Sequence, residues 1–185
     1  MRRKSPKKNQ NQNRNQNQNW LYLAFGAGGT LLLGTIIFVV LSLSNHSFAD
    51  QATKARQAEA RTYVSTLNKL QQAYFTEKDN WGQNINALGI RFNAPTDNYR
   101  YSTQIVNSIK TANIKNYPGI SVQTGLAKKE GLKSYVGVVY LSNTSSNEVT
   151  SLSLLCESNE STNSASGLPK FDGNTMLCPD SYKPL

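Results

Sequence analysis

Few side chains in this sequence of 185 residues have the chemistry of a catalytic or metal-binding group. It contains one histidine, His46, and two cysteines, Cys156 and Cys178. A zinc site built from cysteine and histidine needs about four such ligands, so this count excludes one. No glycine-rich phosphate loop follows a predicted strand. The sequence therefore predicts neither an enzyme nor a protein with a cofactor, a metal or a small-molecule substrate.

Four carboxylates lie close to the two cysteines in the sequence and could offer oxygen ligands to Ca²⁺. They are Glu157, Glu160, Asp172 and Asp180. Their spacing does not follow that of a calcium-binding loop. The pattern favours a solvated acidic surface and leaves calcium binding open as the alternative.

Positive charge is concentrated at the start of the chain. Residues 1–19 hold six of the 20 basic side chains and no acid, so most of the net charge of +9 belongs to them. The same segment is rich in Asn and Gln, and we predict a disordered tail. Bases beside a membrane span usually set its orientation or attract anionic lipid. Without aromatic residues to stack on bases, the tail does not predict nucleic-acid binding.

Residues 20–44 form an uncharged, mostly apolar run of 25 residues. At about 1.5 Å per residue, such a helix spans the ~30 Å hydrocarbon core of a bilayer. The positive-inside rule then places residues 1–19 in the cytoplasm and exports residues 45–185. A cleavable signal peptide is the alternative, because residues 47–49 read Ser-Phe-Ala. The run exceeds the ~7–15 apolar residues of a signal peptide and favours a retained anchor.

The segment after this predicted anchor has the pattern of a long helix. Residues 49–80 contain no Pro or Gly, and apolar side chains recur every three or four residues. We predict that this helix packs on the rest of the domain through Tyr63, Leu67, Leu70 and Tyr74. No strong helix breaker separates it from the apolar run, so the two helices could be continuous.

Strand patterns follow the helix. Residues 99–105, 134–141 and 149–156 are rich in β-prone side chains, and a weaker strand is expected near residues 114–122. The polar cluster at residues 143–147 predicts a hairpin loop. One long helix followed by sequential strands predicts an α+β fold, in which the helix covers one face of an antiparallel sheet.

A loop rich in Ser, Asn and Gly, residues 157–177, is bracketed by Cys156 and Cys178. In an exported domain, two cysteines favour a disulfide over two free thiols. We predict this disulfide, and we predict a recognition surface on the loop that it closes. Lys170 and Phe171 are the candidate contacts, and polar substitutions there are expected to leave stability nearly unchanged. The alternative is a bridge that only stabilises the last strand.

Several short motifs occur in a set order along residues 49–182. An alanine-rich helix leads into a Gln-Gln-Ala-Tyr segment, and the loop after it ends in Leu-Gly. A Thr-x-x-Tyr-x-Tyr strand, a Leu-Lys-Ser-Tyr-Val-Gly segment and a late Leu-Cys and Cys-Pro pair follow. These motifs stand at residues 71–74, 88–89, 96–101, 132–137, 155–156 and 178–179. Together they resemble the bacterial type IV pilin-like G and H group.

The resemblance implies a pilin fold and a non-enzymatic, minor or accessory role in a pilus or pseudopilus. Pilin subunits or pilus assembly proteins would be partners, and the domain would lie outside the bacterial cytoplasmic membrane. The chain departs from the pilin pattern at residues 19–22, where Asn-Trp-Leu-Tyr stands in place of a glycine-containing leader motif, and residues 20–44 contain no acid. The alternative is therefore a membrane-tethered recognition module that does not join a filament.

Overall fold

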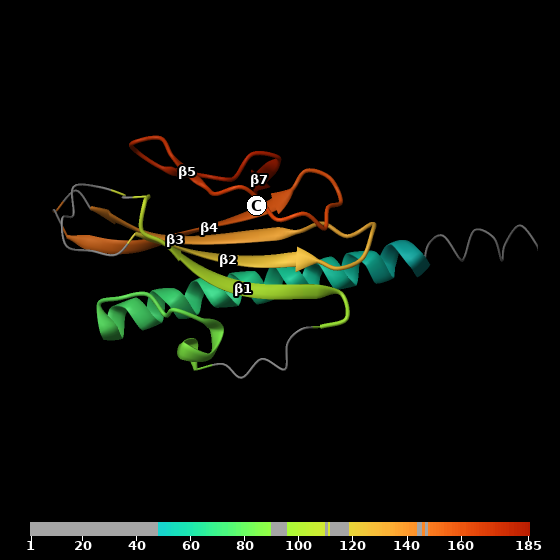
Figure 1. The fold of residues 1–185 in the computed structure, drawn as a ribbon, viewed down its shortest axis with the longest axis horizontal. Coiled ribbons are helices and arrows are strands. Elements are labelled where there is room, and N and C mark those ends of the chain that lie inside the picture. The colour runs from blue at the N-terminus through green and yellow to red at the C-terminus, as the bar shows by residue number, and fades with distance from the viewer. Residues whose placement is uncertain (1–47, 90–95, 110, 112–118, 144–145, 147) are drawn as a thin grey trace, which may run out of the picture. The chain divides into compact units, whose positions relative to one another are not determined.

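The computed structural model describes residues 48–89, 96–109, 111, 119–143, 146 and 148–185 (Figure 1). The predicted tail, the predicted anchor and His46 lie outside these residues. Within the described ranges, no helix is both long and apolar enough to cross a bilayer. Residues Gln51–Leu185 form one compact unit.

Residues 48–78 are helical, close to the predicted range of 49–80. The segment has no Pro or Gly to interrupt the helical hydrogen bonds. It ends where Asp79 adopts a positive φ of 51°, and the Asp79 N–H donates to the carbonyl oxygen of Phe75 (2.8 Å). We refer to this element as the long helix.

In the part of the chain that the structure describes, five strands form one antiparallel sheet in the order β1-β2-β3-β4-β7. Two short strands, β5 and β6, pair separately as a hairpin, and a 3-10 helix, η1, precedes β1. The bounds are η1 Ile85–Leu88, β1 Tyr99–Val106, β2 Ile120–Ala127, β3 Tyr135–Asn143, β4 Val149–Ser158, β5 Lys170–Phe171, β6 Met176–Leu177 and β7 Tyr182–Pro184.

The predicted α+β arrangement of one helix on an antiparallel sheet is present. The strands predicted at residues 99–105, 134–141 and 149–156 are β1, β3 and β4. The weaker strand predicted near residues 114–122 is β2, which begins at Ile120. Its alternating sequence pattern starts only after the Pro-Gly pair at residues 118–119. Residues 112–118 are outside the described ranges. The short strands β5, β6 and β7 have too few residues to show a period in the sequence.

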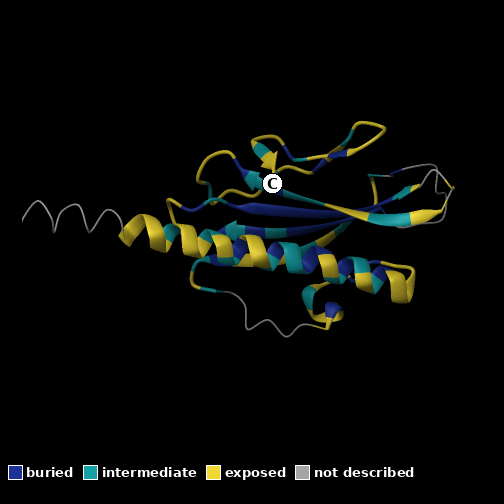
Figure 2. Ribbon diagram, turned by 180° about the vertical axis from the view of Figure 1, so that it is seen from behind, coloured by how far each residue is buried: buried dark blue, intermediate teal, exposed yellow. Residues whose placement is uncertain are grey.

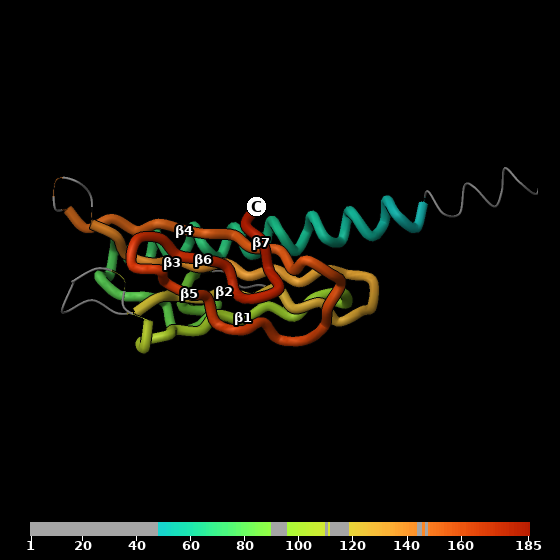
Figure 3. Tube along the Cα trace, turned by 90° about the horizontal axis from the view of Figure 1, so that it is seen from above, coloured from blue at the N-terminus to red at the C-terminus, as the bar shows by residue number. Residues whose placement is uncertain are grey.

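Two layers cover the two faces of the sheet. The long helix lies along one face, and the chain after β4 lies over the other (Figures 1 and 3). The central strand β3 is accordingly buried along seven consecutive residues, from Tyr135 to Leu141. A strand with one solvent-facing side would alternate between buried and exposed residues.

The buried face of the long helix differs from the predicted one. Ala60, Val64 and Leu67 are fully buried, and Gln71 and Phe75 continue the same face. Figure 2 shows exposed residues along the side of the helix that faces away from the sheet. Of the four predicted contacts, Leu67 lies at the centre of the buried face. Tyr63 is half-buried but also contacts the sheet as predicted, because its ring stacks on that of Tyr101 in β1 (4.8 Å between ring centroids). The other two, Leu70 and Tyr74, lie at the margin of this face and are half-buried.

Two glycines explain why this face is the one that docks. Gly125 in β2 and Gly137 in β3 lie under the long helix, where a Cβ on either would clash with the side chain of Val64. A Cβ on Gly137 would also clash with Asn68. The missing side chains let the helix approach the sheet closely at Val64 and Asn68.

Amide side chains on the helix hold it in register with distant segments. Asn68 Nδ2 donates to the carbonyl oxygen of Leu154 in β4 (3.1 Å). Gln71 makes two hydrogen bonds with the main chain of Gly82, one as donor (2.8 Å) and one as acceptor (2.9 Å). Gln71 is thus paired at both its donor and its acceptor, whereas Asn68 is paired only through Nδ2, and its Oδ1 is buried without a hydrogen-bond partner among the described residues. These bonds fix the geometry of the interface.

Candidate recognition surface

The chain between β4 and β7, residues 159–181, crosses the face of the sheet opposite the long helix (Figure 3). We call this segment the strap. Beneath it lies an apolar cluster from four strands and the strap, and Met176 is its buried strap residue. The sheet members are Val106, Ile120, Val122, Val136, Val138, Tyr140 and Cys156. The strap is thus a second layer of the domain and not an appended loop.

Cys156 in β4 and Cys178 in the strap form the predicted disulfide. Cys156 is fully buried within the apolar cluster, and Cys178 packs against the same cluster. The bridge therefore fastens the strap to the sheet at Cys156. The two cysteines are 22 residues apart in the sequence.

The two candidate contact residues have different surroundings. Lys170 is exposed, and its ammonium group lies 2.7 Å from both carboxylate oxygens of Asp180. Phe171 is half-buried and packs against the apolar cluster. A polar substitution at Phe171 would therefore remove buried apolar area, so nearly unchanged stability is no longer expected there. Of the two, only Lys170 presents its side chain to solvent.

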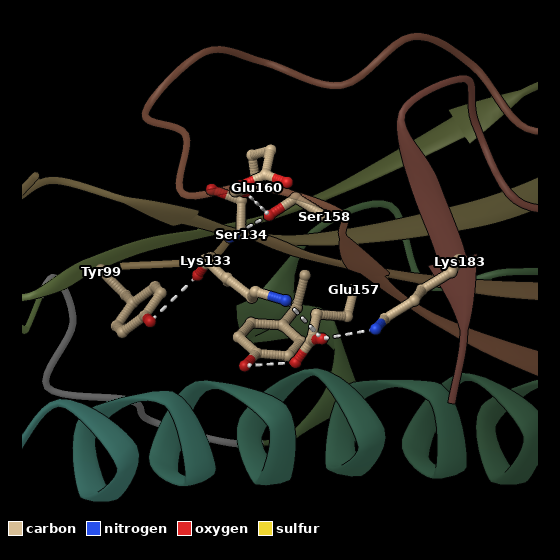
Figure 4. A network of polar contacts seen from close by, with 8 residues as sticks. Tyr99, Lys133, Ser134, Glu157, Ser158, Glu160 and Lys183 are labelled. Carbon is tan, nitrogen blue, oxygen red and sulfur yellow. Dashed lines mark hydrogen bonds and ion pairs between the residues drawn. The ribbon is translucent and has the colours of Figure 1, made fainter. Parts of the chain in front are cut away.

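Two serines attach the start of the strap to the sheet (Figure 4). The Ser134 N–H donates to Ser158 Oγ (3.0 Å), and the Ser158 N–H donates to the Ser134 carbonyl oxygen (2.9 Å). Ser134 Oγ donates to the carbonyl oxygen of Thr162 (2.6 Å) and accepts from the Ala127 N–H (3.0 Å). Both serines are buried. Ser134 thus connects β2, β4 and the strap through one side chain and its own main chain.

We expect the Ser134→Ala substitution to lower the free energy of unfolding by about 1–3 kcal/mol, because it leaves the buried Ala127 N–H without its acceptor. Hydrogen exchange should speed up in residues 159–168 before it does so in the long helix. Ser153→Ala, at an exposed β4 serine, is the matched control and should change stability by less than about 0.5 kcal/mol. Equal losses for the two variants would show that Ser134 does not anchor the strap.

A charged network holds the last strand at the edge of the sheet (Figure 4). Glu157 in β4 lies 3.0 Å from Lys133 Nζ and 3.8 Å from Lys183 Nζ of β7. The Tyr135 hydroxyl donates to the other carboxylate oxygen (3.1 Å). Burial, and then the negative charge of Glu157, raises the pKa of Tyr135 well above its usual value, so the phenol stays protonated as a donor.

The remaining carboxylates near the disulfide also have identified positions. Asp172 accepts hydrogen bonds from the N–H groups of Asn174 and Thr175, which hold the pKa of its carboxyl below the usual value. Asp180 pairs with Lys170, and Glu160 is exposed. The four acids considered for calcium do not converge on one point. Among the described residues, no group of three or more acidic, histidine or cysteine side chains could hold a metal ion.

Two of the hollows that border the strap share part of their lining. The first, of about 210 Å³, lies between the strap and the outer face of β1 and β2. The second, of about 640 Å³, follows the strap itself and is lined mainly by hydroxyl, amide and carboxyl side chains. Both are lined by Ala165, Ser166, Gly167 and Tyr182. The segment 165–167 therefore separates two open spaces.

Strand alternation in β1 already indicated in the sequence which residues form one wall of the first hollow. In β1, Tyr99 and Tyr101 face the long helix, so strand alternation places Arg100, Ser102 and Gln104 on the opposite face. The Ser134–Ser158 connection had no comparable signal, because the two residues meet only once β3 and β4 pair.

Comparison with known proteins gives one family. Residues 57–179 match the sequence pattern of the family described as type IV pilin-like G and H. The match covers most of the long helix, the strands β1 to β6 and both cysteines. Neither the curated proteins nor the solved structures contain a significant match to this chain.

Proposed function

Because the chain belongs to the type IV pilin-like G and H family, we propose that it is a non-enzymatic, membrane-anchored minor or accessory component of a pilus or pseudopilus system. The observation that carries this proposal is the family match, which spans most of the long helix, the strands β1 to β6 and both cysteines. Its partners would be pilin subunits or pilus assembly proteins.

Membrane anchoring is the second part of the proposal. The 25 uncharged residues from Trp20 to Ser44 and the six bases before them support a single span with the N-terminus in the cytoplasm. The Cys156–Cys178 bridge supports a periplasmic or extracellular domain, because disulfides persist in oxidising compartments. Anionic lipid would then be the partner of the basic tail.

Intact-mass measurement of the protein purified from its native membrane tests the anchor. A retained span gives the mass of the whole chain, whereas a mature N-terminus at Asp50 would contradict the anchor. Replacing Arg2, Arg3 and Lys4 by Glu should reduce correct insertion, measured by protease protection in vesicles. Unchanged topology in that variant would contradict the charge argument.

A tethered recognition module that does not join a filament is the second candidate. The junction Asn-Trp-Leu-Tyr at residues 19–22 and the absence of acids in residues 20–44 favour it. Co-purification after membrane solubilisation separates the two candidates. Recovery of pilin subunits and assembly proteins supports the pilus component; recovery of other partners without them supports the module.

A further inference from the structure

The first hollow is a groove with two unlike walls. One wall is the outer face of the edge strand β1 and its neighbour β2, which presents Arg100, Ser102, Gln104 and Thr124. The other wall is the strap at residues 165–168. Apolar side chains, among them Val122, Leu126 and Val136, complete its lining. Its volume is about 210 Å³, below the ~300–1,000 Å³ of typical small-molecule sites.

The strap wall offers unused main-chain groups. Thr162 and Asp172 donate their N–H groups to carbonyl oxygens at the two sides of this segment. Between them, residues 165–168 make no hydrogen bond to any other described residue through their main chain. Main-chain N–H and C=O groups nearly always pair with protein or water, and a segment that is paired only with water can accept an added strand.

The sheet wall offers an uncompensated positive charge. Lys133, Lys170 and Lys183 each pair with a carboxylate. Arg100, in contrast, is exposed and forms no ion pair with any residue that the structure describes. A guanidinium group can bind a carboxylate through two parallel hydrogen bonds, so this side of the groove is complementary to an acidic group.

We propose that the groove between β1 and the strap binds an extended acidic peptide segment of a partner protein. The main chain of the peptide pairs with residues 165–168, and one of its carboxylates pairs with Arg100. This inference rests on the proposed role of the domain as a component that recognises a partner outside the membrane. The amide of Gln104 and the hydroxyls of Ser102 and Thr124, which share one hydrogen bond with each other (2.6 Å) and keep further acceptor capacity, serve the alternate side chains of the peptide.

Selection of phage-displayed random nonapeptides on the full-length protein in nanodiscs tests the proposal. Peptides enriched on the protein should carry Asp or Glu at one fixed position. Their affinity, measured by fluorescence polarisation, should fall at least tenfold for Arg100→Gln. Lys69→Gln is the matched control, because it removes an exposed positive charge from the helix on the opposite face of the sheet and should leave affinity unchanged.

N-methylation of single residues in an enriched peptide tests the main-chain pairing without altering the protein. Strand addition predicts that methylation at alternate positions abolishes binding and that the positions between them tolerate it, because only one edge of the peptide faces the strap. Uniform tolerance, or equal binding to Arg100→Gln, would overturn the proposal. So would a selection without enrichment, or Arg100-dependent binding of glycans in place of peptides.

Failure of these tests is distinguishable from failure of the proposed function. Peptide binding is measured on purified protein, whereas the pilus role is measured by co-purification from membranes. If pilus proteins co-purify with the protein but the enriched peptides bind Arg100→Gln equally well, the pilus role stands. Only the inference about the groove is then rejected.

Discussion

The Leu67→Ala substitution is expected to lower the free energy of unfolding by about 2–5 kcal/mol. Leu67 is fully buried on the face of the long helix that docks on the sheet. The substitution removes apolar contacts and leaves a cavity, because the closely docked helix and the glycine-containing strands beneath it can relax only in part. Urea unfolding of the full chain in detergent measures the change, followed by tryptophan fluorescence, to which the buried Trp81 contributes the signal of the folded domain.

Leu70→Ala is the matched control for this prediction. It makes the same chemical change on the same helix, three residues further on, at a half-buried position. Full burial of a leucine side chain contributes ~1.5–3 kcal/mol to stability. Leu70 is only half-buried, so its substitution should lower the free energy of unfolding by about 1 kcal/mol. Leu67 belongs to both the predicted and the observed face, whereas Leu70 belongs only to the predicted one. A larger loss at Leu70 than at Leu67 would therefore contradict the docked face of the structure.

Loss of the disulfide in Cys178→Ser should lower the free energy of unfolding by about 3 kcal/mol, the loop-closure entropy of a crosslink over a separation of 22 residues. Cys178 is chosen because Cys156 is fully buried, and its thiol would still fill its place in the apolar cluster. The strap should lose hydrogen-exchange protection in residues 159–177, whereas the long helix should keep it under native conditions.

Reductant separates the crosslink from the substitution. The unchanged protein in reductant should unfold at the same urea concentration as Cys178→Ser, and the variant itself should not respond to reductant. If reductant leaves the unchanged protein as stable as before, the bridge contributes nothing beyond the packing of the strap, and the loop-closure argument is wrong for this domain.

Local pattern was sufficient for the long helix, for the longer strands β1, β3 and β4, and for the family. The absence of Pro and Gly from residues 49–80 predicted the long helix, and β-prone runs predicted β1, β3 and β4. The exported location inferred for the domain also predicted the disulfide that the structure contains. Each of these inferences depends on neighbouring residues in the chain or on a pairing with only one possible partner.

The run from Tyr135 to Leu141 also indicated in the sequence that this strand is covered on both faces. A strand with seven consecutive residues of low polarity is expected to be covered on both faces. The helix accounts for one face, so a second layer was required, and the strap is that layer. Its own strands, β5 and β6, have two residues each and could not be recognised by period.

Tertiary structure alone decided which face of the long helix docks on the sheet and where a groove remains between the strap and β1. Tyr63, Leu70 and Tyr74 are more apolar than Asn68 and Gln71, yet the two amides are the more deeply buried. The reason is that Gly137 leaves room for Asn68, and that other segments supply hydrogen-bond partners: Leu154 is 86 residues from Asn68 in the sequence, and Gly82 is 11 residues from Gln71, beyond the end of the helix. Helix periodicity reports apolar character along one chain segment, whereas burial depends on the space and the partners that other segments provide.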